Sequence, residues 1–227
     1  MDLSSALDVL SAQGWFSERS AETRARLGAI AKLRGFAKGE RVYLAGDLPN
    51  GVFGLISGSL NISIPRADGE TYTVHRAGTG FWFGDLAIFS QGRRLVSVHA
   101  AEPTLTVQLP GRDLTRLVEE DPRLYGDFYA LTYENFRTAF QIISNLAISS
   151  ADKRVADRLL LEVEARGDDE GWIEVSQSEL ASFAAVSLPT LKRVMRRFAE
   201  AGSINLGYAK LQIVDRAALA RVRRRAD

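Results

Sequence analysis

Residues 177–198 read QSELASFAAVSLPTLKRVMRRF, and their pattern predicts two short helices joined by a tight turn. Ser176 stands three residues before Glu179, a spacing that lets each side chain bond the other residue's free backbone N–H at a helix start. Ser187 can cap the second helix, and Pro189 falls in its first turn, where a missing N–H costs nothing. The stretch therefore predicts a helix-turn-helix.

The second helix of this pair separates apolar from cationic side chains. Its apolar positions recur at i, i+3, i+4 and i+7, so we expect one face to enter a core: Leu191, Val194, Met195 and Phe198. The other side carries the residues predicted to meet DNA, which are Ser187, Pro189, Thr190, Lys192, Arg193, Arg196 and Arg197. Four of them are cations and none is a carboxylate, which suits a helix laid against phosphates in a major groove. A solvated face of an ordinary helix pair is the alternative.

The surroundings of the helix pair favour nucleic acid. The whole chain has a net charge of +1, but residues 172–227 hold 10 Lys/Arg against 5 Asp/Glu, so this segment carries +5 and the remainder −4. Residues 203–206 and 210–214 flank a Gly-Tyr pair as a small hairpin. Residues 151–227 are therefore predicted to form a winged helix-turn-helix that binds DNA. A module that binds a partner protein is the alternative, which the positive charge disfavours.

The first half of the chain has a β pattern. Short helices are expected at 3–10 and 22–33, and after them come β-type runs separated by glycines. The expected strands are 41–44, 51–56, 60–64, 71–75, 95–100 and 104–109. Strands at such regular intervals are typical of a double-sheet jelly roll, also called a double-stranded β-helix. The predicted fold class is α+β, with this domain over residues 1–120.

A long helix is predicted over 122–149, within a dimerisation segment assigned to 121–150. Residues step along it by threes and fours at heptad-like spacing, and they form the predicted dimer interface: Leu124, Phe128, Leu131, Asn135, Ala139, Ile142 and Leu146. A small barrel can cover only part of this stripe. The simplest partner for the remainder is the same helix from a second copy, which gives a two-fold homodimer. Packing on its own domain alone is the alternative.

Several function classes are excluded or disfavoured. The chain has no cysteine, which excludes disulfides, thiolate metal sites and cysteine nucleophiles. No stretch approaches the roughly 18 consecutive apolar residues that span a bilayer, so a cytoplasmic location without a membrane partner is expected. A cupin-like jelly-roll enzyme would need clustered histidines, whereas His75 and His99 lie 24 residues apart. We therefore predict no metal site and no catalytic residue.

The order of a glycine-rich β-roll, a long helix and a winged helix resembles the CRP/FNR superfamily of bacterial transcription regulators. The residues that carry the resemblance are Gly39-Glu40, Gly46-Asp47, Gly58, Phe83-Gly84-Asp85-Leu86, Arg94 and the stretch from Ser187 to Arg193. The resemblance covers nearly the whole chain. It implies a homodimer that binds a palindromic operator in double-stranded DNA, with RNA polymerase as a further partner.

Family members of the cyclic-AMP type hold the nucleotide with a Gly-Glu pair, an Arg-Ser pair and a Thr-Ser pair on the long helix. In this chain Asp85 replaces the glutamate, Leu95 stands where the serine would be, and Ala139 and Phe140 replace the Thr-Ser pair. Ordinary cyclic-AMP affinity is therefore not expected, because each lost bond to a buried charged group costs on the order of 1.5–3 kcal/mol.

The same residues still define a candidate site for a small anionic effector, which comprises Gly84, Asp85, Leu86, Arg93, Arg94, Leu95, Ala139 and Phe140. Arginines that are simply exposed on a loop are the alternative. The expected function is a regulator with a different effector or none. A true cyclic-nucleotide-responsive regulator is the alternative.

The reading helix also departs from the family pattern Ser-Arg-Glu-Thr-x-x-Arg. Ser187, Thr190 and Arg193 match it, but Leu188 and Pro189 replace the Arg and Glu that read bases. Arg193 is the candidate for a base contact, because a bidentate guanidinium recognises guanine, whereas Ser187 and Thr190 are assigned to phosphate. The target sequence should therefore differ from that of the best-known family members.

Overall fold

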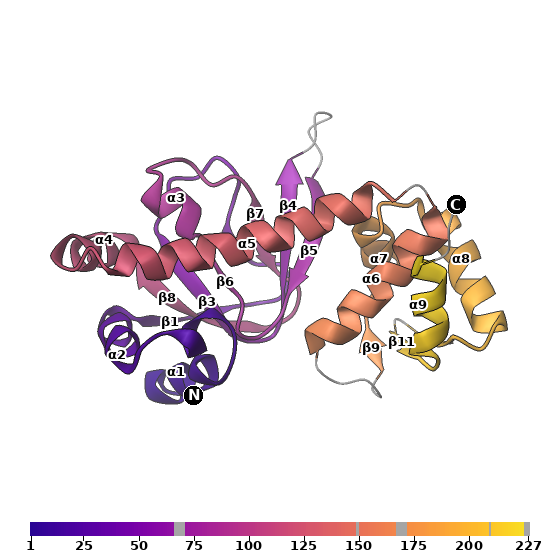
Figure 1. Ribbon diagram of the computed structural model, residues 1–227, viewed down its shortest axis with the longest axis horizontal. Coiled ribbons are helices and arrows are strands. Elements are labelled where there is room, and N and C mark those ends of the chain that lie inside the picture. Colours follow the sequence, from indigo (N-terminus) through magenta and orange to yellow (C-terminus); the bar gives the residue numbers. More distant parts are fainter. Residues whose placement is uncertain (66–70, 149, 167–171, 209, 225–227) are drawn as a thin grey trace. The chain divides into compact units, whose positions relative to one another are not determined.

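The computed structural model describes residues 1–227 except 66–70, 149, 167–171, 209 and 225–227. The chain divides into two compact units, Met1–Ala139 and Phe140–Asp227. Figure 1 shows that the first unit holds two β-sheets with helices around them and that the second is mostly helical. This element content agrees with the predicted α+β class.

The first unit is a sandwich of two antiparallel four-stranded sheets. One sheet has the strand order β1 (Lys32–Phe36), β8 (Thr104–Pro110), β3 (Gly51–Ser57) and β6 (Trp82–Phe83). The other has the order β2 (Arg41–Tyr43), β7 (Ser97–Ala100), β4 (Leu60–Pro65) and β5 (Thr71–Ala77). Both sheets contribute to one core, whose buried members are Tyr43, Phe53, Leu55, Leu60, Ala77, Phe83, Val98 and Ala100. The predicted double-sheet architecture is confirmed.

Two strands of this sandwich were not expected from the sequence. Strand β6 has two residues, too few to produce an alternating pattern, and β1 lies within residues expected to be helical or unassigned. Strand β6 depends on a glycine in its neighbour: a Cβ at Gly54 would lie 2.5 Å from the ring of Trp82. Only glycine lets the indole pack flat against β3 at this register.

Four helices cover the sandwich and enclose a second core: α1 (Leu3–Ala12), α2 (Ala21–Ile30), α4 (Gly111–Glu120) and the first part of α5 (Leu124–Leu146). The short helix η1 (Trp15–Glu18) contributes two aromatic side chains to this core. Trp15 Nε1 donates to the Asp127 carbonyl at 2.7 Å, and its ring contacts Phe128 at a centroid distance of 5.2 Å. The N-terminal segment is thereby tied to α5.

Helix α5 turns a different face outward from the one predicted. Leu124, Phe128 and Leu131 are at most 2% exposed within a single chain, because they pack in the core of the first unit. They are unavailable to a second copy, and this part of the predicted dimer interface is wrong. Asn135 is bonded within its own unit, Ala139 is exposed, Ile142 is half-buried, and the side chain of Leu146 lies outside the described residues.

The exposed face of α5 carries large side chains at steps of three and four residues: Tyr125, Tyr129, Tyr133, Phe136, Phe140 and Ile143. The sequence contains two apolar stripes on one helix, and the structure assigns the first to the core of the same chain.

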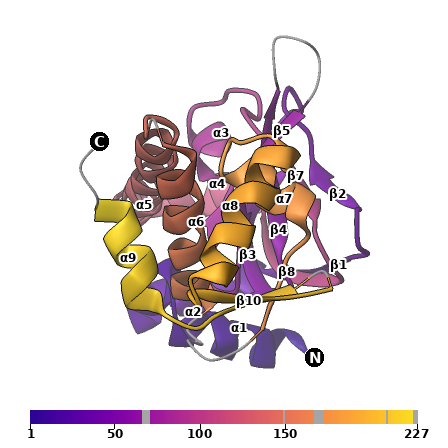
Figure 2. The same ribbon diagram turned by 90° about the vertical axis from the view of Figure 1, so that its right-hand side faces the viewer.

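The second unit is a winged helix-turn-helix, as predicted. After the end of α5 come α6 (Ala151–Arg166), β9 (Ile173–Glu174), α7 (Gln177–Phe183), α8 (Leu188–Glu200), β10 (Ile204–Gly207), β11 (Lys210–Ile213) and α9 (Arg216–Arg224). The three strands form one antiparallel sheet in the order β10-β11-β9. Figure 2 shows α9 beside α6, and both helices contribute to the core that also buries the apolar face of α8.

Candidate nucleic-acid interface and sensor site

The helix pair begins with the capping arrangement predicted from the sequence. The backbone N–H of Ser176 donates to Glu179 Oε2 at 3.0 Å, and the backbone N–H of Glu179 donates to Ser176 Oγ at 3.2 Å. Leu180 and Phe183 of α7 are buried. Two free donors at the helix start are thereby satisfied, and the apolar side of α7 is fixed against the core.

The turn between α7 and α8 is held by Arg154, a residue that the sequence analysis did not select. Its guanidinium donates to the carbonyls of Ala184 at 3.1 Å, Ala185 at 3.3 Å and Ile148 at 2.7 Å. Ala185 has a φ of 50°, in the left-handed region that a residue with a Cβ adopts only at a cost. One side chain of α6 therefore joins the strained turn to the segment that precedes α6.

Helix α8 buries the four predicted apolar residues and exposes three cations. Leu191, Val194, Met195 and Phe198 are at most 6% exposed. The side chains of Lys192, Arg193 and Arg196 are exposed, and no ion pair or hydrogen bond joins them to any described residue. Such cations are available to phosphate oxygens or base edges.

The fourth cation of this helix is not free. Arg197 forms an ion pair with Asp152 at the start of α6, a partner 45 residues away in sequence. The expectation that no carboxylate faces the cations of α8 is therefore wrong for Arg197. Its neighbour on the helix face, Arg193, keeps its guanidinium unengaged.

At the start of α8, the two hydroxyl residues bond to each other. Ser187 Oγ lies 2.9 Å from Thr190 Oγ1 and accepts from the backbone N–H of Thr190 at 3.3 Å. The side chains of Leu188 and Pro189 are exposed beside them. The cap predicted at Ser187 is confirmed.

In the first unit, Arg94 points into the protein and serves as an internal clamp. It is 3% exposed, and it donates to the Gly84 carbonyl at 2.8 Å, the Gly51 carbonyl at 2.7 Å and Asn50 Oδ1 at 3.1 Å. Its guanidinium carbon also lies 4.1 Å from the ring centroid of Tyr43. The fork predicted for an anion is thus occupied by the protein's own oxygens, and the alternative of an exposed loop arginine is wrong for Arg94.

Asp85 opens helix α3 (Asp85–Phe89) and is buried at 2% exposure. Its carboxylate accepts from Thr132 Oγ1 at 2.5 Å and from Asn135 Nδ2 at 2.8 Å, both on α5. Burial raises the pKa of Asp85 above its ordinary value, and the two hydrogen bonds oppose that shift. The residue that replaces the family's glutamate is therefore turned toward α5.

The other predicted effector residues are more exposed. Arg93 is exposed and donates to the Gly46 carbonyl at 2.7 Å, and Leu86 and Leu95 are 40% and 69% exposed. Gly84 has a φ of 95°, and a Cβ there would lie 2.6 Å from Arg94 Nη1, so only glycine fits beside the clamp. The structure brings Gly84 and Arg94 together with Asp85 next in the chain, while Ala139 and Phe140 are exposed on α5.

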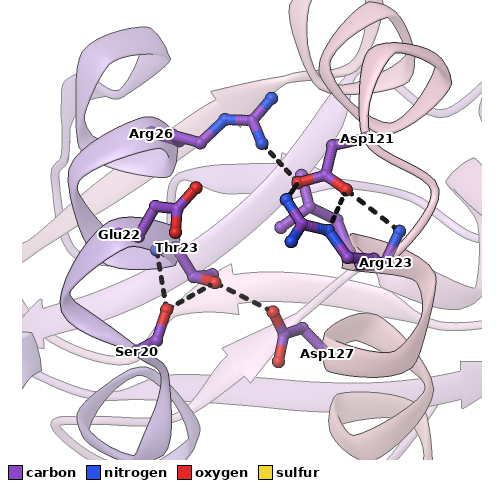
Figure 3. Close-up of a pocket in the computed structure, with 8 residues that line it drawn as sticks. Ser20, Glu22, Thr23, Arg26, Asp121, Arg123 and Asp127 are labelled. Carbon is purple, nitrogen blue, oxygen red and sulfur yellow. Dashed lines mark hydrogen bonds and ion pairs between the residues drawn. The ribbon is translucent and has the colours of Figure 1, made fainter.

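A pocket of about 140 Å³ lies between α2, the residues after α4 and the start of α5, and none of the predicted effector or DNA-binding residues lines it. Figure 3 shows that its charged walls bond to each other. Asp121 pairs with Arg26 and with Arg123, whose Nε lies 2.8 Å away, and Thr23 Oγ1 donates to Asp127 Oδ2 at 3.2 Å. The hydrogen bonds from Arg123 lower the pKa of Asp121 to about 2.

Among the described residues, no cluster of three or more His, Asp and Glu side chains has the geometry to hold a metal ion. In that same part of the chain, no helix has the length and apolar character needed to cross a membrane.

Comparison with known proteins defines the class of this chain. Residues 33–121 match the cyclic nucleotide-binding domain, and residues 153–222 match the Crp-like helix-turn-helix domain. The "Cyclic AMP receptor protein" of Thermus thermophilus is 27% identical over 185 residues, which are 81% of this chain and 84% of that protein. The "Transcriptional activator protein anr" of Pseudomonas aeruginosa is 26% identical over 200 residues, 82% of this chain and 78% of that protein.

Solved structures give the same fold. FixK2 from Bradyrhizobium japonicum has a TM-score of 0.76 at 19% identity and covers 87% of this chain and 100% of its own. A sensor-type β-roll joined to a Crp-like helix-turn-helix defines a DNA-binding transcription regulator, which is not an enzyme. The chain belongs to the CRP/FNR superfamily.

Proposed function

We propose that this regulator acts as a homodimer that places two copies of α8 on a palindromic operator, with Arg193 at a base edge. The observation that carries the proposal is the exposed row of Lys192, Arg193 and Arg196, which meets no carboxylate among the described residues. Positive side chains on the second helix of a helix-turn-helix neutralise phosphates and reach the major groove. Ser187, Pro189 and Thr190 lie at the same end of the reading helix.

The proposed dimer contact is the exposed face of α5. Tyr129, Tyr133 and Ile143 are 76%, 62% and 58% exposed, and together with Tyr125 they recur at the spacing of a helix seam. A contiguous apolar face of this kind is typical of a contact with another protein surface. A second copy of α5 presents the same face, so a two-fold axis satisfies both copies at once.

The proposed role of the β-roll is to sense an effector other than cyclic AMP, or none. An anionic ligand would need the donors of Arg94 that Gly84, Gly51 and Asn50 already accept. Breaking those bonds would leave buried oxygens unpaired, a cost of about 1–3 kcal/mol each. The hydrogen bonds from Thr132 and Asn135 likewise engage the carboxylate of Asp85.

A true cyclic-nucleotide-responsive regulator is the second candidate. Its support is the match of residues 33–121 to a cyclic nucleotide-binding domain and the 27% identity to a protein named for its cyclic-AMP receptor function. Calorimetric titration of the full chain with cyclic AMP and cyclic GMP separates the two candidates. Saturable binding that also raises operator affinity would overturn the first candidate, whereas no heat and no change in affinity would support it.

Binding to an operator is tested by selecting duplexes from a random-sequence library with the full-length chain. We expect inverted repeats whose half-sites lie about one helical turn, or a multiple of it, apart. Sedimentation measures whether the chain is a dimer when free and when bound. A chain that stays monomeric, or that selects no common sequence, would refute the proposal.

RNA polymerase is the protein partner proposed for this regulator, in the cytoplasm of a bacterial cell. Transcription from a promoter that carries the selected operator, with and without the protein, measures this. A change in transcript level with unchanged polymerase concentration is the expected outcome.

A further inference from the structure

The first turn of α8 presents hydrocarbon instead of hydrogen-bonding groups. Leu188, the first residue of the helix, is 38% exposed, and the exposed Pro189 has neither a side-chain donor nor a backbone N–H. The only hydroxyls nearby, on Ser187 and Thr190, lie 2.9 Å from each other within the helix cap. Apart from this cap, the turn that leads the helix has no side-chain group that can bond a base edge.

This placement has a consequence for base recognition. In a helix-turn-helix, the N-terminal residues of the second helix contact base edges in the major groove. The C5 methyl of thymine is the one apolar group on those edges, whereas guanine, cytosine and adenine present donors or acceptors. An apolar side chain gains free energy by burying the methyl, and it leaves a polar base edge desolvated without a partner. Both effects favour thymine.

We propose that Leu188, with Pro189 beside it, reads the C5 methyl of a thymine in each half-site. Specificity at that base pair then comes from apolar contact and from rejection of polar edges, while Arg193 supplies the hydrogen-bonded contact elsewhere in the half-site. The inference rests on the proposed operator-binding function. It goes beyond that function because it names the chemical group that the first turn of α8 recognises.

The test removes only the methyl group. The full-length chain binds a duplex that it has selected from a random-sequence library, and each thymine is replaced in turn by deoxyuridine. At one thymine in each half-site, we expect the dissociation constant to rise about three- to tenfold, the scale of one buried methyl group. In Leu188→Ala the same replacement should change the dissociation constant by less than about twofold, because the contact is already gone.

Two variants serve as matched controls. Leu188→Met keeps an apolar side chain of similar volume and should retain the deoxyuridine penalty. Leu206→Ala removes another exposed leucine of the same unit, on β10 and 44% exposed, and should also retain it. Thermal unfolding of each variant checks that the helix pair is intact.

The outcomes separate this inference from the proposed function. Specific binding that is insensitive to deoxyuridine at every thymine would overturn methyl recognition and leave operator binding standing. A deoxyuridine penalty that persists unchanged in both Leu188→Ala and Pro189→Ala would overturn the assignment to these side chains. Failure to select any duplex would refute operator binding, and this inference with it.

Discussion

Arg94 and Arg193 show how differently two arginines of one chain can be used. Arg94 is 3% exposed and donates to three oxygens of its own unit, whereas Arg193 is exposed on α8 with no partner among the described residues. Both were candidates for binding an anion. The difference teaches that an arginine fork signals an external ligand only where the protein supplies no oxygens for it.

The same contrast applies to the carboxylates near these arginines. Asp85 is turned toward Thr132 and Asn135 of α5, while Asp152 takes up one cation of α8, Arg197. Internal pairing removes a charge from the set available to ligands. The two units therefore differ in what their arginines are free to bind, and variants can test that difference.

The largest expected effect is on the stability of the first unit. Arg94→Ala removes three hydrogen bonds and the contact with Tyr43, and it leaves the carbonyls of Gly51 and Gly84 without their donor. We expect the free energy of unfolding to fall by about 3–5 kcal/mol, the usual cost of breaking a buried charged network. Urea denaturation measures it.

Arg93→Ala is the matched control, because this neighbouring arginine is exposed and donates only to Gly46. It should leave the urea midpoint nearly unchanged. Equal midpoints for Arg93→Ala and Arg94→Ala would mean that the buried clamp contributes nothing, and the comparison would fail.

The second effect is on DNA affinity. Arg193→Ala should weaken binding to the selected duplex by about 5- to 150-fold, which corresponds to about 1–3 kcal/mol for a lost bidentate base contact. Its thermal stability should be that of the unmodified chain, since the side chain contacts no described residue. Electrophoretic mobility shift assays give the affinity.

Arg116→Ala removes an exposed arginine of α4, paired with Asp113, and serves as the control for charge. It should bind the duplex as tightly as the unmodified chain. Full affinity in Arg193→Ala would remove α8 as the reading helix.

The third effect is a pH dependence that separates a buried charge from an exposed one. Since burial raises the pKa of Asp85, the folded state binds its proton more tightly than the unfolded state does. The cost of the buried charge is fully present above the raised pKa and is relieved as the pH falls toward 4. Asp85→Asn should therefore melt a few degrees higher at pH 7, with a difference that shrinks toward pH 4.

Asn fits the site, because its oxygen can accept from Asn135 and its amide can donate to the Thr132 hydroxyl. Melting curves from pH 7 to pH 4 measure the difference. A gap that widens as the pH falls would show that the charged form of Asp85 is the stabilising one.

The features predicted well from sequence are those set by local spacing. The cap at Ser176 and Glu179 and the apolar face of α8 involve residues at most seven positions apart. Pairings across the chain were missed, because periodicity does not contain them: Arg197 meets Asp152 from 45 residues away, and Arg94 meets Gly51 from 43. Sequence alone offered no signal for Arg154, whose role depends on the carbonyls of a folded turn.

The two apolar stripes of α5 show the same limit. Leu124, Phe128 and Leu131 repeat at the spacing of a helix seam, and so do Tyr125, Tyr129 and Tyr133. Spacing predicts that each stripe packs against something. It does not say which stripe faces the sandwich, because that depends on where the β-strands and η1 place their side chains.

The smallest expected effect compares two cations on α8 itself. Lys192→Gln removes one unpaired charge per subunit, so the slope of log affinity against log salt should fall in magnitude by about two for a dimer. Arg197→Gln removes a charge that Asp152 already partners, and a phosphate could engage it only by breaking that pair. Its effect on the slope should be clearly smaller. Equal changes in slope would mean that the ion pair opens on DNA at no cost, and that the division between engaged and available cations does not extend to α8.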